Sequence, residues 1–184
     1  IIFSIFFISC KEEKYKYDIS DFRTELRPSL KSLSKEKSLP SKDTIARNFI
    51  EKNATKEELI KLMDSKSPLL RVIAYRTFVN KEEPEYFDLL VNHLSDTAKV
   101  NWWYYVDVEG RFNVSDLMIR KAHDKNGLSP IQKKYLVEKV LLEHPYLETS
   151  TWMIHDINPN EKYYNLIKKR AGLKSDNCGK QLSA

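Results

Sequence analysis

Apolar residues in the first part of the domain recur every three or four positions, the spacing of one face of an α-helix. The first such set starts near Ile19 and comprises Phe22, Leu26, Leu30 and Leu33. Pro28 falls inside this set, and it should bend or divide the helix because proline lacks an amide proton and clashes with the preceding turn. The same spacing predicts further helices after Ser41, Thr55, Ser67, Pro84, Ser129 and Asn158, and within residues 115–122 and 146–154.

Local capping signals mark where several of these helices begin. Thr55 is followed three residues later by Glu58, a capping box in which each side chain satisfies a free backbone donor of the other residue. Ser67 and Ser129 each precede a proline, which suits the first helical position because its missing N–H costs nothing there. The segment 69–79 is apolar around most of its circumference, so we expect it to be an inner helix.

A different period appears between residues 99 and 114. Apolar and aromatic side chains there take alternate positions, as in a β-strand, with Val100, Trp102, Tyr104 and Val106 on one side and Trp103 and Tyr105 on the other. Val108–Gly110 could turn the chain back through residues 111–114. We therefore predict a β-hairpin or an extended insertion near residues 99–114, with a helix as the alternative.

Residues 1–9 form a nearly continuous apolar run that ends at a cysteine and a charged segment. The run is too short for a membrane-spanning helix, which needs about 20 apolar residues. It fits the apolar core of a secretory signal peptide, which needs only about 7–15. We interpret it as the remnant of a cleaved signal; the alternative is a buried first strand or helix of the domain.

The end of this run, Phe-Ile-Ser-Cys at residues 7–10, resembles the lipobox of bacterial lipoproteins. Its last three residues match the family pattern, whereas Phe7 stands where leucine is usual. The resemblance implies cleavage before Cys10 and a diacylglycerol on the Cys10 sulfur. Each buried CH₂ of an acyl chain contributes about 0.8 kcal/mol, so more than one chain gives a stable membrane anchor.

Two other features of the sequence bear on the prediction of a lipidated Cys10. Lys11–Glu13 is similar to the short lysine-plus-acidic tag of lipoproteins exported to the surface of some Gram-negative bacteria, although a solvated charge run is the commoner explanation of such a segment. The only other cysteine, Cys178, lies in a polar tail and is unpaired if Cys10 carries lipid. A disulfide between Cys10 and Cys178 is the alternative.

Residues 57–78 resemble a HEAT-type repeat, and residues 85–100 resemble the start of a second one. The first match consists of a leucine-rich helix, Asp64 in the turn, a restart at Pro68, and Arg71 in the second helix. The resemblance implies an all-α fold, a short α-solenoid of HEAT-like helix pairs with the insertion near residues 99–114. An irregular helical bundle is the alternative.

These observations divide the chain into four parts. They are a signal-peptide remnant at 1–9, a lipidated cysteine and polar tether at 10–17, a HEAT-like helical domain at 18–172, and a flexible tail at 173–184.

Composition narrows the range of functions. Only four glycines are present, which argues against glycine-rich phosphate loops and turn-rich all-β folds. The net charge of +5 arises from 31 basic and 26 acidic residues that are interspersed along the chain. A nucleic-acid surface would need clustered cations, and the nearest cluster, Lys168–Arg170, is typical of a last helical turn. We do not expect nucleic acid as a partner.

No catalytic or metal-binding motif is present. A helical zinc site needs two histidines about four residues apart. No two histidines of this chain have that spacing; they are His93, His123, His144 and His155. Nucleophile-elbow, P-loop and S-x-x-K motifs are also missing from the sequence. We predict no catalytic residue, no metal and no cofactor.

The adjacent aromatic residues Trp102, Trp103, Tyr104 and Tyr105 are the best candidates for binding. Neighbouring residues of a strand face opposite sides, so one pair must find a second partner or stay exposed. Exposed Trp and Tyr carry much of the binding energy at protein interfaces. The alternative is that Trp102 and Tyr104 fill the core while a helix covers the other two.

The sequence therefore predicts a lipoprotein of the bacterial cell envelope, anchored on the periplasmic or surface side, that binds a protein or peptide without catalysis. Two alternatives stay open. One is an inhibitor or immunity-type lipoprotein that blocks a toxin or enzyme. The other is a cell-envelope hydrolase, which requires at least two of the histidines and nearby acids to meet in one pocket.

Overall fold

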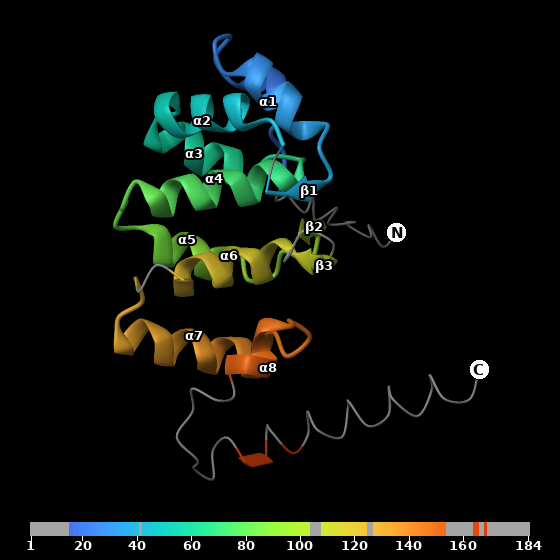
Figure 1. Cartoon of the computed structure of the whole chain (residues 1–184). Helices are drawn as coiled ribbons and strands as arrows, with labels where there is room; N and C mark the ends of the chain where they lie inside the picture. Colours follow the sequence, from blue (N-terminus) through green and yellow to red (C-terminus); the bar gives the residue numbers. More distant parts are fainter. Residues whose placement is uncertain are drawn as a thin grey trace, which may run out of the picture.

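The computed structural model of the chain describes residues 15–40, 42–103, 108–124 and 127–153, together with Tyr164, Asn165 and Lys168. Over these residues the chain is mainly helical and carries a small mixed sheet (Figure 1). Its elements are η1 (Ile19–Asp21), α1 (Arg27–Ser34), β1 (Ser38–Leu39), α2 (Thr44–Asn53), α3 (Lys56–Met63), α4 (Pro68–Asn80), α5 (Tyr86–Asn92), β2 (Lys99–Trp103), β3 (Glu109–Asn113), α6 (Val114–Asp124), α7 (Pro130–Glu143) and α8 (Thr149–Met153).

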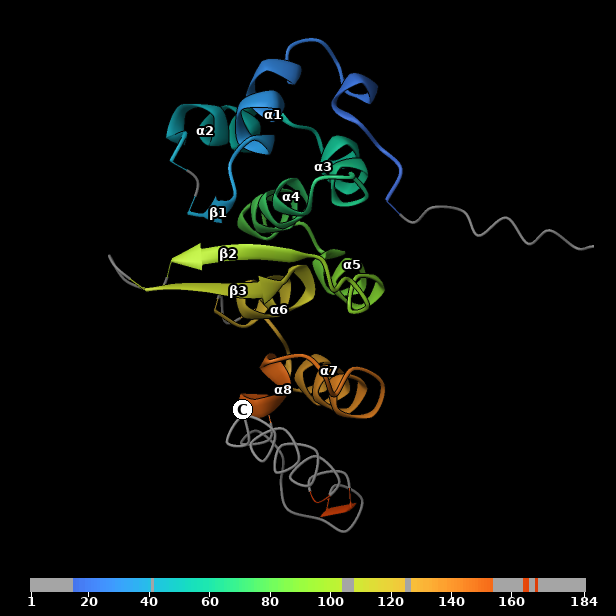
Figure 2. The same cartoon turned by 90° about the vertical axis from the view of Figure 1, so that its right-hand side faces the viewer.

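The helices follow one another along the long direction of the molecule. In Figure 2, α3, α5 and α7 lie one above another, and α4, α6 and α8 form a second column beside them. Helix α4 packs against both α3 and α6. The connections are unequal, because residues 64–67 join α3 to α4 whereas residues 93–113, which include the hairpin, separate α5 from α6.

Helix α4 is the centre of the hydrophobic core. Its N-cap is Ser67, whose hydroxyl accepts a hydrogen bond from the Leu70 N–H, and Pro68 occupies the first turn. All of its 13 residues are buried except Pro68, Arg76 and Asn80. The prediction of an inner helix is therefore confirmed, and the two polar exceptions mark a side of α4 that the core does not cover.

Most of the predicted helix boundaries agree with the structure. The Thr55–Glu58 capping box opens α3, and a matching box between Ser129 and Gln132 opens α7. Helix α7 ends before Pro145, as expected. Near the start of the domain the chain is divided, since η1 is separate from α1, which carries Pro28 in its first turn.

The predicted start of α2 is wrong. Ser41 lies outside the described residues, and the N-cap is Asp43, whose carboxylate accepts a 2.8 Å hydrogen bond from the Ala46 N–H. One acceptor and one donor from earlier in the chain favour Asp43 in this role: Glu36 accepts its backbone N–H at 2.8 Å, and the Ser32 hydroxyl donates to its carboxylate. On α2 only Ala46 and Ile50 are buried.

The predicted hairpin is confirmed. Strands β2 and β3 pair antiparallel, from Lys99 opposite Asn113 to Trp103 opposite Glu109. The predicted turn is misplaced, because Gly110 pairs with Trp102 inside the ladder. Strand β1 runs parallel to β2 and completes the order β1-β2-β3. The all-α class must therefore be corrected to a mainly helical fold with a three-stranded mixed sheet.

The ends of the predicted domain are described only in part. Residues 15–17, which we assigned to the tether, lie against the turn after α3: the Lys16 N–H donates to the Asp64 carbonyl at 3.0 Å, and the Lys66 N–H donates to the Tyr17 carbonyl at 3.0 Å. The last predicted helix, after Asn158, falls almost wholly outside the described residues, as does the tail.

Candidate binding pocket beside the hairpin

A pocket of about 370 Å³ lies where the sheet meets α2 and α4. This volume is within the range of roughly 300–1,000 Å³ that is usual for small-ligand sites. Its apolar lining comes from Leu39, Pro40, Ile73, Trp102 and Trp103, and its polar lining comes from Arg47, Glu51, Arg76 and Asn80. The pocket thus combines aromatic surface with two guanidinium groups and one carboxylate.

Helical spacing explains why the polar residues converge. Ile73, Arg76 and Asn80 are three and four residues apart on α4, so they share one face of that helix. Arg47 and Glu51 are four apart on α2, and the Arg47 Nε lies 3.8 Å from the Glu51 Oε1. Because both side chains are about one-third exposed, this ion pair is weak.

The sheet supplies the opposite wall. The register places Leu39 of β1 beside Trp102 of β2, and Pro40 follows directly after a cis peptide bond. Trp102 packs against the core, with its ring edge-on to Phe112 at a centroid distance of 6.3 Å. Trp103, the last residue of β2, is only partly buried. Trp102 therefore joins the pocket to the hydrophobic core.

Arg76 is the distinctive charged group of the pocket. It is partly buried, and its guanidinium carbon lies 5.8 Å from the centroid of the Trp102 ring. Burial lowers the pKa of Arg76, the Asp124 charge raises it, and nearby Arg47 lowers it further. An arginine stays charged throughout the physiological range regardless. Among the described residues, no hydrogen bond or ion pair engages the Arg76 side chain.

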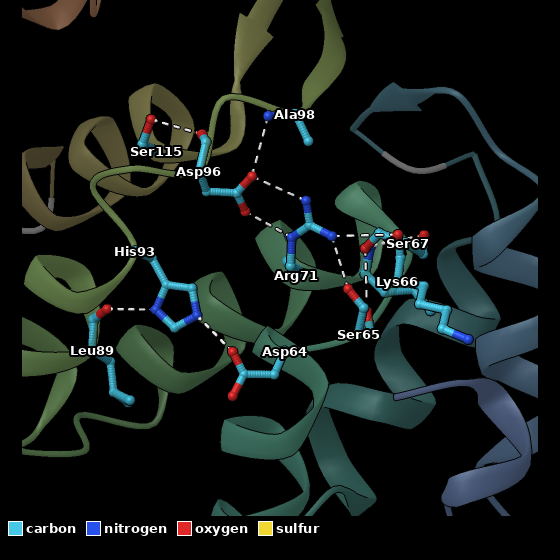
Figure 3. A network of polar contacts seen from close by, with 11 residues as sticks. Asp64, Ser65, Lys66, Ser67, Arg71, Leu89, His93, Asp96, Ala98 and Ser115 are labelled. Carbon is cyan, nitrogen blue, oxygen red and sulfur yellow. Dashed lines mark hydrogen bonds and ion pairs between the residues drawn. The ribbon is translucent and has the colours of Figure 1, made fainter. Parts of the chain in front are cut away.

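A second arginine of α4 has the opposite environment (Figure 3). Arg71 and Asp96 are 2% and 1% exposed, and two N–H···O contacts of 2.7 and 3.0 Å join the guanidinium to the carboxylate. Arg71 also donates to the carbonyls of Ser65, at 2.8 Å, and Lys66, at 3.3 Å. This pair is buried and well supplied with partners, so it ties α4 to the chain after α5 and leaves no open position for a ligand.

The residues around the Arg71–Asp96 pair also contact one another rather than leaving space for a ligand. His93 lies with Nδ1 2.7 Å from the Leu89 carbonyl oxygen and Nε2 3.3 Å from a carboxylate oxygen of Asp64 (Figure 3). The Tyr15 ring covers Arg71, with 3.9 Å between its centroid and the guanidinium carbon. Burial, and then the charge of Asp96, raise the pKa of Tyr15, so its phenol stays neutral.

A buried carboxylate plays a similar part between α6 and α8. Asp116 accepts hydrogen bonds from the Asn113 amide at 2.7 Å and from both the backbone N–H and the hydroxyl of Thr149 at 2.9 Å. The carboxylate thus fixes the first residue of α8 to the first turn of α6.

The structure brings together two of the four predicted binding residues, Trp102 and Trp103. Tyr104, Tyr105 and the predicted lipidation site Cys10 lie outside the described residues. Sequence reasoning missed Arg76 and Arg47, although a second cation inside the otherwise apolar segment 69–79 was a usable signal.

The three described histidines have separate environments. His93 is buried beside Asp64, and His144 lies beside Tyr146. The His123 ring packs edge-on against the Trp152 ring, with 4.9 Å between the two ring centroids. Within the described ranges, no group of three or more His, Cys, Asp or Glu side chains is arranged to hold a metal ion.

The remaining findings concern the apolar character of the helices and the similarity of the chain to known proteins. None of the helices in the described part of the chain has the length and apolar character needed to span a bilayer. No protein-family model matches the chain, and neither curated protein sequences nor solved structures give a significant match.

Proposed function

We propose that this protein is a membrane-anchored lipoprotein whose helical domain is a non-catalytic module that binds a protein or peptide segment in the bacterial cell envelope. The observation that carries the binding function is the pocket of Trp102, Trp103 and Arg76. Tryptophan and arginine are the residue types most enriched among those that dominate binding energy, and here they line one concavity.

The lipid anchor rests on the lipobox-like residues that end at Cys10. Tyr15 contacts Arg71, and Lys16 is hydrogen-bonded to the turn after α3. Five residue steps separate Cys10 from Tyr15, and an extended chain covers about 3.5 Å per residue. A lipid on Cys10 would therefore hold the folded domain within roughly 20 Å of the bilayer surface.

The HEAT-like organisation is part of the same proposal. If α3 and α4, α5 and α6, and α7 and α8 are taken as successive pairs, a buried polar contact links each pair to the next. It joins the first half of the second helix of one pair to the residues that follow the first helix of the next pair. Arg71 of α4 reaches Asp96 after α5, and Asp116 of α6 reaches Thr149 after α7. Ties of this kind suit stacked pairs, because each pair is stabilised mainly by its neighbours.

The anchor is tested with Cys10→Ser in the full chain. We expect the substituted protein to leave the membrane fraction and to appear in the soluble envelope fraction. Continued membrane association of the substituted protein would contradict lipidation at Cys10.

The binding module is tested by recovering partners from the envelope with the full chain and with Trp103→Ala. Ile131→Ala is the matched control, since Ile131 is an exposed apolar residue of α7 that does not line the pocket. We expect a partner whose recovery falls at least ten-fold with Trp103→Ala, is unchanged with Ile131→Ala, and is reproduced with the purified partner. Equal recovery by all three proteins would exclude the pocket as the binding surface.

A further inference from the structure

The pocket presents a cation that forms no hydrogen bond or ion pair with the described residues, although the charges of Asp124 and Glu51 act on it from farther away. Arg76 offers five N–H donors, and within the described part of the chain none of them makes a hydrogen bond. Its guanidinium carbon lies 5.8 Å from the centroid of the Trp102 ring. A partly buried guanidinium gains most from an acceptor that replaces the water it has lost. Arg71 on the same helix shows the satisfied state, with a bidentate carboxylate and two carbonyls.

The residues that line the pocket carry a net positive charge. Its lining holds two guanidinium groups, Arg47 and Arg76, and a single carboxylate, Glu51. Glu51 forms its ion pair with Arg47, at 3.8 Å, and acts on Arg76 only through its charge. Outside the lining, Arg120, whose central carbon lies 6.0 Å from the Trp102 ring centroid, and Asp124, whose charge acts on Arg76, carry opposite charges.

We propose that this pocket is a carboxylate-binding subsite in which Arg76 pairs with a carboxylate of the bound segment while Trp102 and Trp103 hold its apolar part. The inference deepens the proposed function and depends on it. The planar guanidinium fork matches a carboxylate in a bidentate pair. Leu39, Pro40 and Ile73 add apolar surface for the neighbouring carbon atoms.

A carboxylate fits this site better than a phosphate group. Glu51 in the lining repels a dianion more strongly than a monoanion. The carboxylate has two possible sources in a peptide, the C-terminal carboxyl group after an apolar residue, or an Asp or Glu side chain. The two sources share the same chemistry and are separated by experiment.

The test titrates small probes into the ¹⁵N-labelled full chain and follows the tryptophan indole and arginine side-chain N–H signals by NMR. The probes are N-acetyl-phenylalanine, its neutral amide, N-acetyl-glutamate α-amide, and phenyl phosphate. A probe of this size that fills the subsite should bind with a dissociation constant on the order of 1 mM. We expect at least one carboxylate probe to bind ten-fold or more tightly than the neutral amide, and the tighter of the two identifies the source.

Two variants assign the effect to the pocket. Arg76→Gln should weaken carboxylate binding at least ten-fold, and Arg76→Lys should weaken it less because the charge remains. Arg111→Gln is the control, as Arg111 is an exposed arginine of β3 outside this pocket, and it should bind as the unaltered chain does. If Arg76→Gln fails to fold, the comparison of acid with amide on the unaltered chain still decides.

Three results would overturn the inference: equal binding of acid and amide, unchanged binding by folded Arg76→Gln, or preferred binding of phenyl phosphate. Partner recovery that depends on Trp103 but not on Arg76 would refute the carboxylate subsite and leave the binding module standing. Recovery that depends on neither residue would refute both.

Discussion

Replacement of Asp96 by asparagine removes one charge from the most deeply buried ion pair that the structure describes. The side chain keeps nearly the same shape and can still accept the Ala98 N–H, which lies 3.2 Å from Oδ1 in the present structure. Arg71 keeps its two backbone carbonyls, Ser65 and Lys66, but loses the opposite charge. The asparagine NH₂ would replace Oδ2, which accepts the Arg71 Nε–H, so one of the two side-chain hydrogen bonds is lost together with the charge.

The expected loss of stability follows from burial. Arg71 and Asp96 are 2% and 1% exposed, so water cannot solvate the guanidinium that remains. Removal of one partner from such a pair costs about 3–5 kcal/mol. The free energy of unfolding of a single domain is only about 5–15 kcal/mol, so Asp96→Asn should remove a large part of it.

Urea unfolding followed by circular dichroism measures this loss. With an m-value of about 2 kcal/mol per molar urea, the midpoint should fall by about 1.5–2.5 M. Asp18→Asn is the matched control, because Asp18 also pairs with a cation at 2.7 Å but both partners are more than half exposed. That exposed pair should contribute less than about 1 kcal/mol.

A double-mutant cycle with Arg71→Met shows whether the loss arises from the pair. Arg71→Met with Asp96→Asn removes both charges, so its cost should fall below the sum of the single costs by about 2 kcal/mol or more. Additive single costs, or a loss of less than 1 kcal/mol for Asp96→Asn, would refute the reasoning.

Two further predictions concern helix starts. Thr55→Ala removes the hydroxyl that accepts the Glu58 N–H at 3.2 Å, and it should cost about 1 kcal/mol in a thermal melt, whereas Thr55→Ser should cost far less. Hydrogen bonds from the Ser32 hydroxyl and the Ala46 N–H hold the pKa of Asp43 below its ordinary value. Because the folded pKa is the lower one, Asp43 contributes stability above its unfolded pKa, near 4, and loses that contribution as the pH falls through the folded pKa. Urea midpoints between pH 5 and 2 should therefore vary less in Asp43→Asn than in the unaltered chain, and equal slopes would contradict this.

The helix boundaries that were predictable are those set by nearby residues. Thr55 and Ser129 cap through residues three positions on, so both signals are visible in a short window. The start of α2 is different: Asp43 is held by Ser32 and Glu36, and a contact with another helix decides between possible caps. Strand β1 is only two residues long and pairs with residues 101 and 102, which no local pattern anticipates.

The residues of the candidate site also include some that the sequence predicts and some that it does not. Alternating aromatic residues predicted the hairpin and placed Trp102 and Trp103 among the binding candidates. Arg71 and Arg76 look alike in the sequence, since each is a cation in an apolar helix. Only the position of Asp96, 25 residues after Arg71, determines which of the two is neutralised. That information becomes available only when α4 and the chain after α5 are packed together.

The two arginines of α4 point to different sides of the helix. They are five positions apart in the sequence, and at about 100° per residue they point about 140° apart around the helix. Arg71 therefore reaches the buried tie to Asp96, and Arg76 reaches the pocket. Substitutions on the two sides should have separable effects: Asp96→Asn lowers the urea midpoint but leaves the probe affinity of the folded protein unchanged, whereas Arg76→Gln lowers the affinity with little change in the midpoint. A loss of both properties from either substitution would mean that the pocket and the core tie are one coupled unit.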